Sequence, residues 1–176
     1  MRIVSGTHKS RIISVPKNLP VRPTTDFAKE SLFNILNNHF DFSELQVLDL
    51  FSGTGNITYE FASRGSIEIT TVDSNYDCIA FIKKTSNLFG FNNIQTIKSN
   101  VFSFLKQCTN SYDIIFADPP YDMEETILIP NTIFQKKLLK EKGWLIIEHS
   151  HDKNFSGNEH FSETRKYGNV NFSIFY

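Results

Sequence analysis

The most chemically informative stretch of the chain is Asp118-Pro119-Pro120-Tyr121, which follows the apolar run Tyr112–Ala117. This run is short and bounded by polar residues, which is typical of a buried strand. The two prolines lack backbone donors, so the backbone beside Asp118 offers mainly carbonyl acceptors. Together with the Asp118 carboxylate and the Tyr121 ring, these acceptors suit a planar group with an amino NH2, such as a nucleobase amine. A proline turn that only ends the strand is the alternative, because a short motif needs supporting context.

A glycine loop supplies that context. Residues 45–50 predict a strand and residues 57–64 predict a helix, with Gly53 and Gly55 in the loop between them. A strand, a glycine loop and a helix form the first half of a nucleotide-type α/β unit, and the helix N-terminus favours a ligand carboxylate. The loop lacks the Gly-Lys-Ser/Thr of a phosphate-binding loop, and Thr58 stands where a dinucleotide fingerprint has its third glycine. A tight turn without a ligand remains the alternative for these two glycines.

Four polar residues close successive apolar strands of the predicted fold. Asp49, Asp73, Asn100 and Asp118 follow one another at spacings of 24, 27 and 18 residues. The carboxyl ends of parallel strands line the ligand crevice of an open α/β sheet, so we expect these four side chains in one crevice. Asp73 is placed to accept both ribose hydroxyls of a ligand, and Asn100 is placed to reach an adenine edge. Either residue could instead cap the helix that follows its strand.

The length and composition indicate one packed domain. The chain has 176 residues, of which 40% are hydrophobic and 17 are Phe, enough for a substantial core. No apolar stretch approaches membrane-spanning length, and the N-terminus lacks a signal-peptide core. Cys78 and Cys108 form no CxxC motif and fit a reduced thiol pair. These features predict a cytoplasmic protein without a membrane partner.

The net charge of −1 is unevenly distributed along the chain. Residues 1–29 contain six basic residues and one acidic residue, a net charge of +5, and the remaining chain has a net charge of −6. A basic arm on an acidic body predicts contacts with phosphates. We expect these contacts at Arg2, Lys9, Arg11 and Arg22. An ordinary solvated surface is the alternative, because six dispersed charges are fewer than a strong RNA-binding patch carries.

The basic arm precedes the predicted sheet. Residues 2–5 and 11–15 predict a short β-hairpin, and residues 16–23 predict an extended linker. An amphipathic helix is predicted from Thr25 to about Asn38. We therefore divide the chain into a basic hairpin and linker, residues 1–23, and a main domain, residues 24–176.

The later part of the chain completes the predicted sheet. Residues 124–142 predict an interrupted helix, residues 143–148 a fifth strand and residues 161–175 a closing antiparallel hairpin. His149 and His151 have no third ligand at a suitable spacing. We therefore expect ordinary surface or edge histidines here and no metal site.

These motifs together resemble a known family, the RsmD-type bacterial methyltransferases that modify a guanine N2 of small-subunit ribosomal RNA. The resemblance extends over nearly the whole chain. Its segments are Arg-Ile-Val-Ser-Gly at 2–6, Arg-Pro-Thr-Thr-Asp at 22–26, Glu-Ser-Leu-Phe-Asn at 30–34, the loop at 49–56, Ser-Arg-Gly at 63–65 and the tetrapeptide at 118–121. Many amino-methyltransferases share the glycine loop and the tetrapeptide, whereas the segments from 22 to 34 are more specific.

The resemblance implies the α/β fold of class I S-adenosylmethionine-dependent methyltransferases, a Rossmann-like sheet with a C-terminal antiparallel hairpin. It also implies S-adenosyl-L-methionine as the cofactor and ribosomal RNA as the partner, within a small ribosomal subunit or its assembly intermediate. Three departures stand out. Phe27, Ala28 and Lys29 stand where the family usually carries arginines, which calls part of the expected basic surface into question. Asn100 stands where an acid is common, and Ser10 stands where glycine is frequent.

The resemblance and the residue chemistry together predict two sets of contacts. Cofactor contacts are expected in the glycine loop and at the strand ends, at Asp49, Phe51, Ser52, Gly53, Thr54, Gly55, Asp73, Asn100 and Val101. The catalytic set is Asp118, Pro119, Pro120 and Tyr121. There the carboxylate and a proline carbonyl would bind the amine hydrogens, and the aromatic ring would stack on a base that has left its helix or loop.

Two other classes of function remain open. One is an amino-methyltransferase for adenine N6 in DNA or for a protein amide, because the tetrapeptide suits any planar amine. The basic arm and the family-specific N-terminus favour RNA over these substrates. The other is a non-catalytic RNA-binding or assembly module, against which the intact Asp49, Gly53, Gly55, Asp73 and Asp118 argue.

Overall fold

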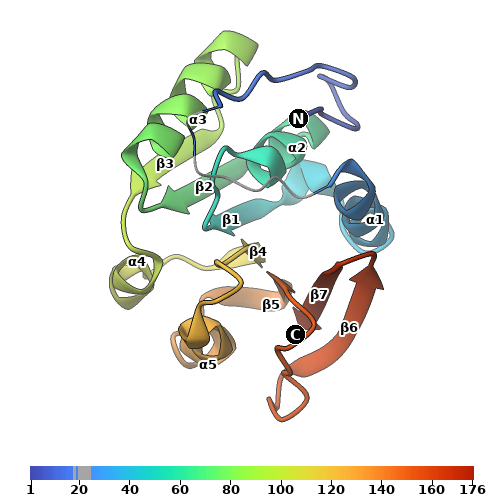
Figure 1. The fold of residues 1–176 in the computed structure, drawn as a ribbon, viewed down its shortest axis with the longest axis vertical. Helices are drawn as coiled ribbons and strands as arrows, with labels where there is room; N and C mark the ends of the chain where they lie inside the picture. Colours follow the sequence, from blue (N-terminus) through green and yellow to red (C-terminus); the bar gives the residue numbers. More distant parts are fainter. Residues whose placement is uncertain (18, 20–24) are drawn as a thin grey trace.

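The fold is built around a mixed β-sheet of seven strands in the computed structural model, which describes residues 1–17, 19 and 25–176 (Figure 1). The strands lie in the order β3-β2-β1-β4-β5-β7-β6. Strands β1 to β5 pair in parallel, and β7 runs antiparallel to β5 and to β6. Their bounds are β1 Gln46–Leu50, β2 Glu68–Asp73, β3 Ile94–Lys98, β4 Tyr112–Ala117, β5 Leu139–His149, β6 Phe161–Tyr167 and β7 Val170–Phe175. This order confirms the predicted Rossmann-like sheet and its C-terminal antiparallel hairpin.

Helices cover both faces of the sheet. Figure 1 shows α1, α2 and α3 on one side and α4 and α5 on the other. The helical elements are α1 Asp26–Asn37, η1 Phe42–Glu44, α2 Asn56–Arg64, α3 Tyr76–Phe89, α4 Val101–Gln107, η2 Glu124–Leu128 and α5 Ile129–Gln135. Side-chain oxygens of Thr25, Asn75 and Asn100 accept backbone N–H bonds in the first turns of α1, α3 and α4. These caps explain why the helices begin there.

Successive side chains of a strand point into two different hydrophobic cores, one on each face of the sheet. Val47 and Phe116 point into the core beneath α1, α2 and α3. Their neighbours Leu48 and Ala117 point into the core beneath α4 and α5. Because side chains alternate along a strand, Asp49 faces the same side as Val47. The side chain of Asp49 therefore lies on the face of the sheet that α2 covers.

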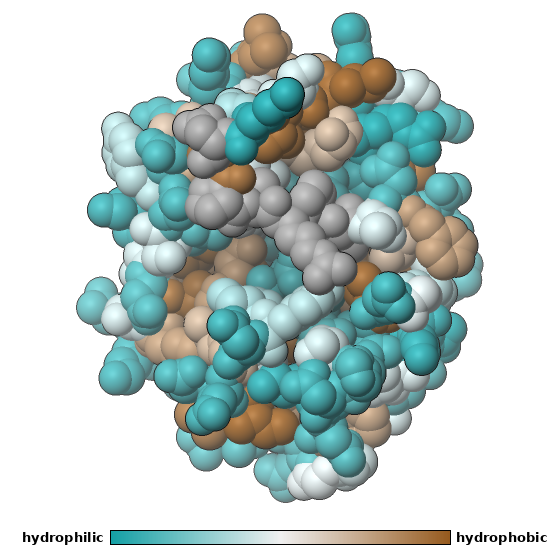
Figure 2. Space-filling view, viewed as in Figure 1, coloured by the Kyte–Doolittle hydropathy of each residue, from teal (hydrophilic) through white to brown (hydrophobic). Residues whose placement is uncertain are grey.

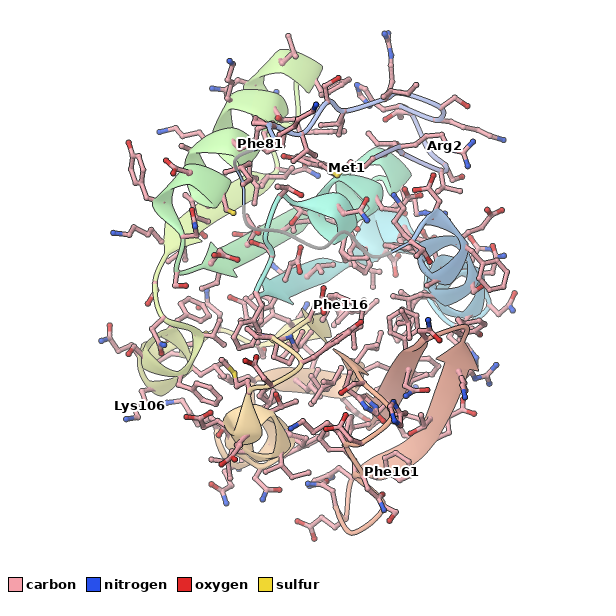
Figure 3. All side chains as sticks on the ribbon, in the orientation of Figure 1. Met1, Arg2, Phe81, Lys106, Phe116 and Phe161 are labelled. Atoms are coloured by element: carbon pink, nitrogen blue, oxygen red, sulfur yellow. The ribbon has the colours of Figure 1, made fainter. Side chains whose placement is uncertain are left out.

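The N-terminal arm packs on the α2 side of this sheet. Arg2 and Ile12 form a single antiparallel bridge, so the predicted hairpin exists as one bridge rather than two full strands. Ile3 and Ile13 are buried in the same core as α1 and α2. Figure 3 shows Arg2 on this side of the sheet and Lys106 on the opposite layer. The arm is thus tied to the main domain through a shared hydrophobic core.

A buried carboxylate anchors the arm to α2. Glu60, with no exposed surface, accepts backbone N–H bonds from Val4 at 2.8 Å and Ser5 at 3.0 Å. Arg64 donates to the same carboxylate at 3.0 Å. Gly6 then passes so close to α2 that a Cβ atom there would lie 1.9 Å from the Ser63 carbonyl oxygen. This contact explains a glycine at the end of the Arg-Ile-Val-Ser-Gly segment.

The predictions for the later chain are right only in part. The interrupted helix predicted over 124–142 exists as η2 followed by α5, which has Pro130 in its first turn, but it ends at Gln135. The predicted start of the fifth strand at Gly143 is wrong, because β5 begins at Leu139. Leu139 pairs with Tyr112, so strand pairing overrides the helical propensity of this segment. His149 is buried rather than at the surface or the sheet edge, and its Nε2 lies 2.8 Å from Ser173 Oγ.

The surface carries scattered apolar side chains. Hydrophilic residues cover most of the face in Figure 2, with separate apolar patches among them. Phe27 is among the exposed apolar residues, with 67% of its surface accessible. In the part of the chain that the structure describes, no helix has the length and apolar character needed to cross a membrane.

Candidate active site

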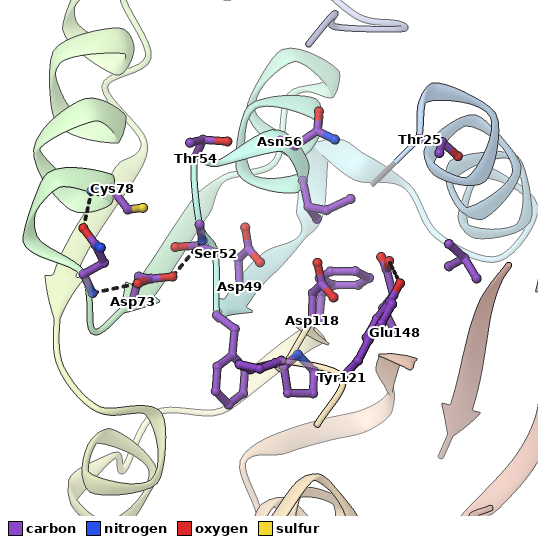
Figure 4. A pocket seen from close by; sticks show the side chains of 18 of the residues that line it. Thr25, Asp49, Ser52, Thr54, Asn56, Asp73, Cys78, Asp118, Tyr121 and Glu148 are labelled. Carbon is purple, nitrogen blue, oxygen red and sulfur yellow. Dashed lines mark hydrogen bonds between the residues drawn. The ribbon is translucent and has the colours of Figure 1, made fainter. Parts of the chain in front are cut away.

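A cavity of about 660 Å³ opens at the carboxyl ends of β1, β2, β4 and β5 (Figure 4). The glycine loop and the end of β2 form one half of its wall. The other half comes from the tetrapeptide after β4, the start of α1 and the β6–β7 turn. A volume of this size suits a small molecule together with part of a second one. The sheet therefore brings the two predicted sets of contacts into one cavity.

The glycine loop turns sharply between β1 and α2. Phe51 adopts a left-handed backbone with φ of 57°, as do Gly53 at 51° and Gly55 at 82°. A left-handed residue other than glycine often marks a functional site. Phe51, Gly53 and Thr54 line the cavity, whereas Gly55 is the N-cap of α2 and does not line it. A Cβ atom at Gly55 would lie 2.9 Å from the Tyr59 ring, so packing requires glycine there.

Asp73 connects the glycine loop to the loop after β2. Its Oδ2 accepts the Gly53 N–H at 2.8 Å, and its Oδ1 accepts the Asn75 N–H at 2.8 Å. Asn75, not Asp73, is the N-cap of α3. Each carboxylate oxygen has a second lone pair, so two bonds to backbone leave acceptor capacity on the cavity side. This carboxylate can therefore fix the loops and bind ligand hydroxyls.

Asp49 is a buried carboxyl group at the base of the cavity. It is 1% exposed, and Thr58 Oγ1 donates to its Oδ2 at 2.5 Å. Burial raises the pKa of Asp49 to about 7, against the opposing effect of the Thr58 hydrogen bond. Thr58 also contacts Thr71 Oγ1 at 3.1 Å. A threonine at position 58, where the dinucleotide fingerprint has its third glycine, is thus explained by the structure, because the Thr58 hydroxyl binds the Asp49 carboxyl group.

The tetrapeptide forms the floor of the opposite half of the cavity. The Asp118 backbone N–H donates to the Leu50 carbonyl at 3.3 Å, which places Asp118 beside the end of β1. Pro119 is buried and Pro120 is exposed. The Tyr121 hydroxyl donates to Glu148 Oε1 at 3.4 Å, the pair joined by a dashed line in Figure 4. Asp118, Tyr121 and Glu148 therefore line the same half of the cavity.

Several cavity residues were missed by the sequence reasoning. Glu148, in β5, is 2% exposed and lines the cavity. It ends the predicted fifth strand, so the rule used for the other four strands would have found it. Some of the other missed residues lie near predicted ones in the chain, namely Asn56, Ile57, Ser74, Asn75, Cys78 and Phe116. The rest come from distant segments and have no local signal: Thr25, Phe27, Tyr167, Gly168, Asn169 and Val170.

Besides Gly55, two predicted cofactor residues lie outside the lining of this cavity. Asn100 is exposed and caps α4, with Oδ1 accepting the Ser103 N–H at 3.1 Å. Val101 is 2% exposed and belongs to the core beneath α4. Their backbone positions after β3 still border the edge of the sheet where β2 ends. Their contact with a cofactor stays a prediction.

Three of the residues predicted to contact RNA, Arg2, Lys9 and Arg11, are described and are not among those that line the cavity. Lys9 and Arg11 are exposed, and Arg2 pairs with Asp26 at 3.4 Å. Arg22 lies outside the described residues. The expected surface charge of the arm needs correction at Lys29, which is 1% exposed and donates to the Arg2 carbonyl and to Asn56 Oδ1. Burial lowers the pKa of Lys29, although Glu60 favours its charged form.

Within residues 1–17, 19 and 25–176, the structure contains no cluster of three or more His, Cys, Asp or Glu residues arranged to hold a metal ion. His149 illustrates this, because both its ring nitrogens face other groups. Nδ1 lies 2.7 Å from the Ser150 carbonyl, and Nε2 lies beside Ser173.

Among the solved structures with this fold, two are described as putative methyltransferases in the following terms. A putative methyltransferase from Escherichia coli, yhhF, has a TM-score of 0.85 at 25% identity and covers 99% of this chain and 96% of that chain. A putative methyltransferase complexed with SAH, SMU.776, has a TM-score of 0.69 at 17% identity and covers 83% of this chain and 48% of that one. The fold and the cavity thus define a class I methyltransferase, for which S-adenosylmethionine is the cofactor.

The sequence comparisons identify the family. The profile of the family described as conserved hypothetical protein 95 matches residues 1–176, and the chain belongs to this family. A relative from Buchnera aphidicola named ribosomal RNA small subunit methyltransferase D is 34% identical over 82% of this chain and 70% of its own length. The protein of the same name from Escherichia coli is 32% identical over 84% and 71%. The predicted family resemblance is confirmed.

Proposed function

We propose that this protein transfers a methyl group from S-adenosylmethionine to the exocyclic N2 amine of a guanine in small-subunit ribosomal RNA. The observation that carries the proposal is one cavity with a ribose-type acceptor, Asp73, on one side and Asp118 with Tyr121 on the other. The names of the relatives support ribosomal RNA as the substrate class. The donor and the acceptor base would then meet between β1 and β4.

The residues of the donor half fit S-adenosylmethionine. Asp73 offers carboxylate oxygens for ribose hydroxyls, and its bonds to Gly53 and Asn75 hold it in place. The ionised form of Asp49, at the base of the cavity, would attract the ammonium of the methionine moiety. The N-terminus of α2 follows directly and favours the methionine carboxylate. Bound S-adenosylmethionine supplies an electrophilic methyl group on a sulfonium.

The residues of the acceptor half would orient the amine. The lone pair of guanine N2 is delocalised into the ring, so the difficulty is to aim it. Asp118 and the Pro119 carbonyl would accept the two amine hydrogens, and Tyr121 would stack on the base. The carboxylate would also stabilise the positive charge that develops on the amine during transfer. Asp118 or solvent would receive the proton afterwards.

The arm is proposed to bind the RNA backbone. Lys9 and Arg11 are exposed near the tip of the arm, next to the turn around Gly6. Contacts with phosphates would position the RNA without selecting a sequence. Base recognition would be left to the cavity.

Methyl transfer from labelled donor to RNA tests the proposal. Free ribosomal RNA, isolated small subunits and assembly intermediates are each offered as substrate, and the product is identified by nucleoside mass spectrometry. N2-methylguanosine is the expected product. N6-methyladenosine would instead identify an adenine enzyme, and the absence of product on every form would favour a binding or assembly role. Mapping of the modified position would then define the target nucleotide.

A further inference from the structure

The buried carboxylate of Glu148 lies beside the catalytic tetrapeptide. In the parallel pair of β4 and β5, Ala117 is opposite Ile147. Asp118 and Glu148 are the next residues on these neighbouring strands, so both face the α2 side of the sheet. Both line the cavity, and Figure 4 shows both side chains pointing into it. The acceptor half therefore contains two carboxylates from adjacent strands.

Glu148 lies on the side of the cavity away from the donor residues. Asp73 belongs to β2, and β1 and β4 separate that strand from β5. On its other side, β5 pairs with β7, where Phe172 is opposite Glu148. The nearest loop on that side is the β6–β7 turn, whose Gly168 lines the cavity. This location suits contact with the acceptor base rather than with the donor.

A carboxylate in this position distinguishes nucleobases by their edges. Guanine presents two adjacent donors, the N1–H and the N2 amine. Adenine presents its amine next to N1, which is an acceptor. A carboxylate can only accept when ionised, so it matches the guanine edge and opposes the adenine edge. A carboxylate facing the N1 acceptor of adenine costs free energy at a buried site, because no water is present to donate a hydrogen bond to either acceptor.

We propose that Glu148 recognises the target guanine by accepting its N1–H, while Asp118 accepts from the neighbouring N2 amine. This inference rests on the proposed function and names the residue that selects guanine. The Tyr121 hydroxyl lies 3.4 Å from Glu148 Oε1, and the Tyr121 ring would stack on the same base. Glu148 thus determines specificity, and Asp118 aims the reacting amine.

The test changes the group at N1 of the base together with the side chain proposed to face it. The mapped target guanine is replaced by 2-aminopurine, which keeps the N2 amine, has an acceptor at N1 and lacks O6. Because the loss of O6 is the same for every protein tested, the difference between proteins reports on N1. The wild-type protein should methylate guanine at least about tenfold more efficiently than 2-aminopurine, by the cost of an unpaired buried acceptor. In Glu148→Gln, the amide NH2 can donate to N1 of 2-aminopurine. The ratio of kcat/KM for guanine over 2-aminopurine should therefore fall by about tenfold or more.

Tyr121→Phe is the matched control. It removes the hydroxyl that contacts Glu148 and keeps the stacking ring, so it should lower both rates and leave most of the discrimination. If it narrows the ratio as strongly as Glu148→Gln, Glu148 serves to position Tyr121 and the inference is wrong. Donor affinity, measured by calorimetry, should be unchanged in Glu148→Gln, which confirms that its cavity is intact.

The outcomes separate this inference from the proposed function. Equal loss of both rates in Glu148→Gln would overturn the role of Glu148 and leave guanine methylation standing. Equal rates of methylation of guanine and 2-aminopurine by the wild-type protein would also overturn the role of Glu148. This comparison does not depend on whether Glu148→Gln folds. N6-methyladenosine as the product, or no product at all, would overturn both.

Discussion

Asp73 and Gly53 are joined by a hydrogen bond of 2.8 Å, from the Gly53 backbone N–H to Asp73 Oδ2. This bond links two loops whose residues are 20 positions apart in the chain. The second oxygen of Asp73 holds the Asn75 N–H in the same way. The proposed ribose contact is thus built on a carboxylate that also sets the shape of the loops around the donor.

Asp73→Ala should weaken donor binding by about tenfold or more, because ribose hydroxyls lose a charged acceptor. The loop bonds to Gly53 and Asn75 are lost as well. Asp73→Asn is the control, since its amide oxygen still accepts one bond and should retain part of the affinity. Isothermal calorimetry with S-adenosylmethionine measures both variants. Unchanged affinity in a folded Asp73→Ala protein would mean that Asp73 only shapes the loops.

Asp118→Ala should lower the rate of methyl transfer by about 10- to 150-fold, the cost of a lost hydrogen bond to a charged group. Donor affinity should change little, because Asp118 faces the acceptor half. Single-turnover kinetics and donor calorimetry separate the two quantities. A variant with the full rate would remove Asp118 from the catalytic set.

Asp49 should make stability fall as the pH rises. Its folded pKa of about 7 is above the unfolded value, so between about pH 4 and 7 the folded state holds a proton that the unfolded state has released. The stability that this group contributes is fully present below about pH 4 and is lost as the pH rises to 7, a change on the order of 4 kcal/mol. Urea unfolding across this range measures it, with Asp49→Asn as the control that lacks the titration. Parallel curves for the two proteins would contradict the buried-acid assignment.

Replacing Lys9 and Arg11 together with Ala should weaken RNA binding and flatten the slope of log affinity against log salt by roughly 1–2 units. Donor affinity should remain the same. The control, Lys106→Ala with Lys136→Ala, removes equal charge from exposed side chains. Lys106 lies on the opposite layer in Figure 3, and the Lys136 side chain donates to the carbonyl of Lys106 at 2.8 Å. An unchanged slope together with weaker donor binding would show that the arm supports the cofactor site instead.

Gly6→Ala should destabilise the protein by about 2–4 kcal/mol, because a left-handed alanine is strained and its Cβ would collide with the Ser63 carbonyl. Gly90→Ala is the matched control. Gly90 is also left-handed, with φ of 70°, but no atom lies within 4 Å of its added Cβ. The control should lose only about 1–2 kcal/mol by chemical denaturation. Equal losses would mean that the arm does not pack tightly on α2.

The strands and their polar ends were predictable because they depend on local patterns. β2 contains the β-branched residues Ile69, Thr70, Thr71 and Val72, which suit a strand covered on both faces. The segment from Lys136 to Lys142 was mispredicted for the opposite reason. Its lysines and leucines favour a helix, but Lys137 and Lys142 adopt positive φ values and the intervening chain joins the sheet. Pairing with β4 is a tertiary effect that local propensity cannot reveal.

The residues of the candidate site that follow strands β2 and β4 could be predicted from the sequence, whereas the residues at the rim of the cavity could not. Asp73 and Asp118 were found from their positions after strands. Phe27 and Tyr167 come from segments far apart in the chain, with ring centroids 6.2 Å apart at the cavity rim. Only the folded sheet brings them together. The burial of Lys29 was equally hidden, because its partners are the Arg2 carbonyl and Asn56.

The anchoring of the arm on Glu60 limits how homologous enzymes can exchange parts. The carboxylate accepts from the Val4 and Ser5 backbone, and Ser63 accepts from Thr7. A chimaera that takes residues 1–13 from a relative would set a foreign backbone against this surface of α2. Protein engineers who wish to graft a different N-terminal arm should therefore transplant it together with α2, as one interlocking module.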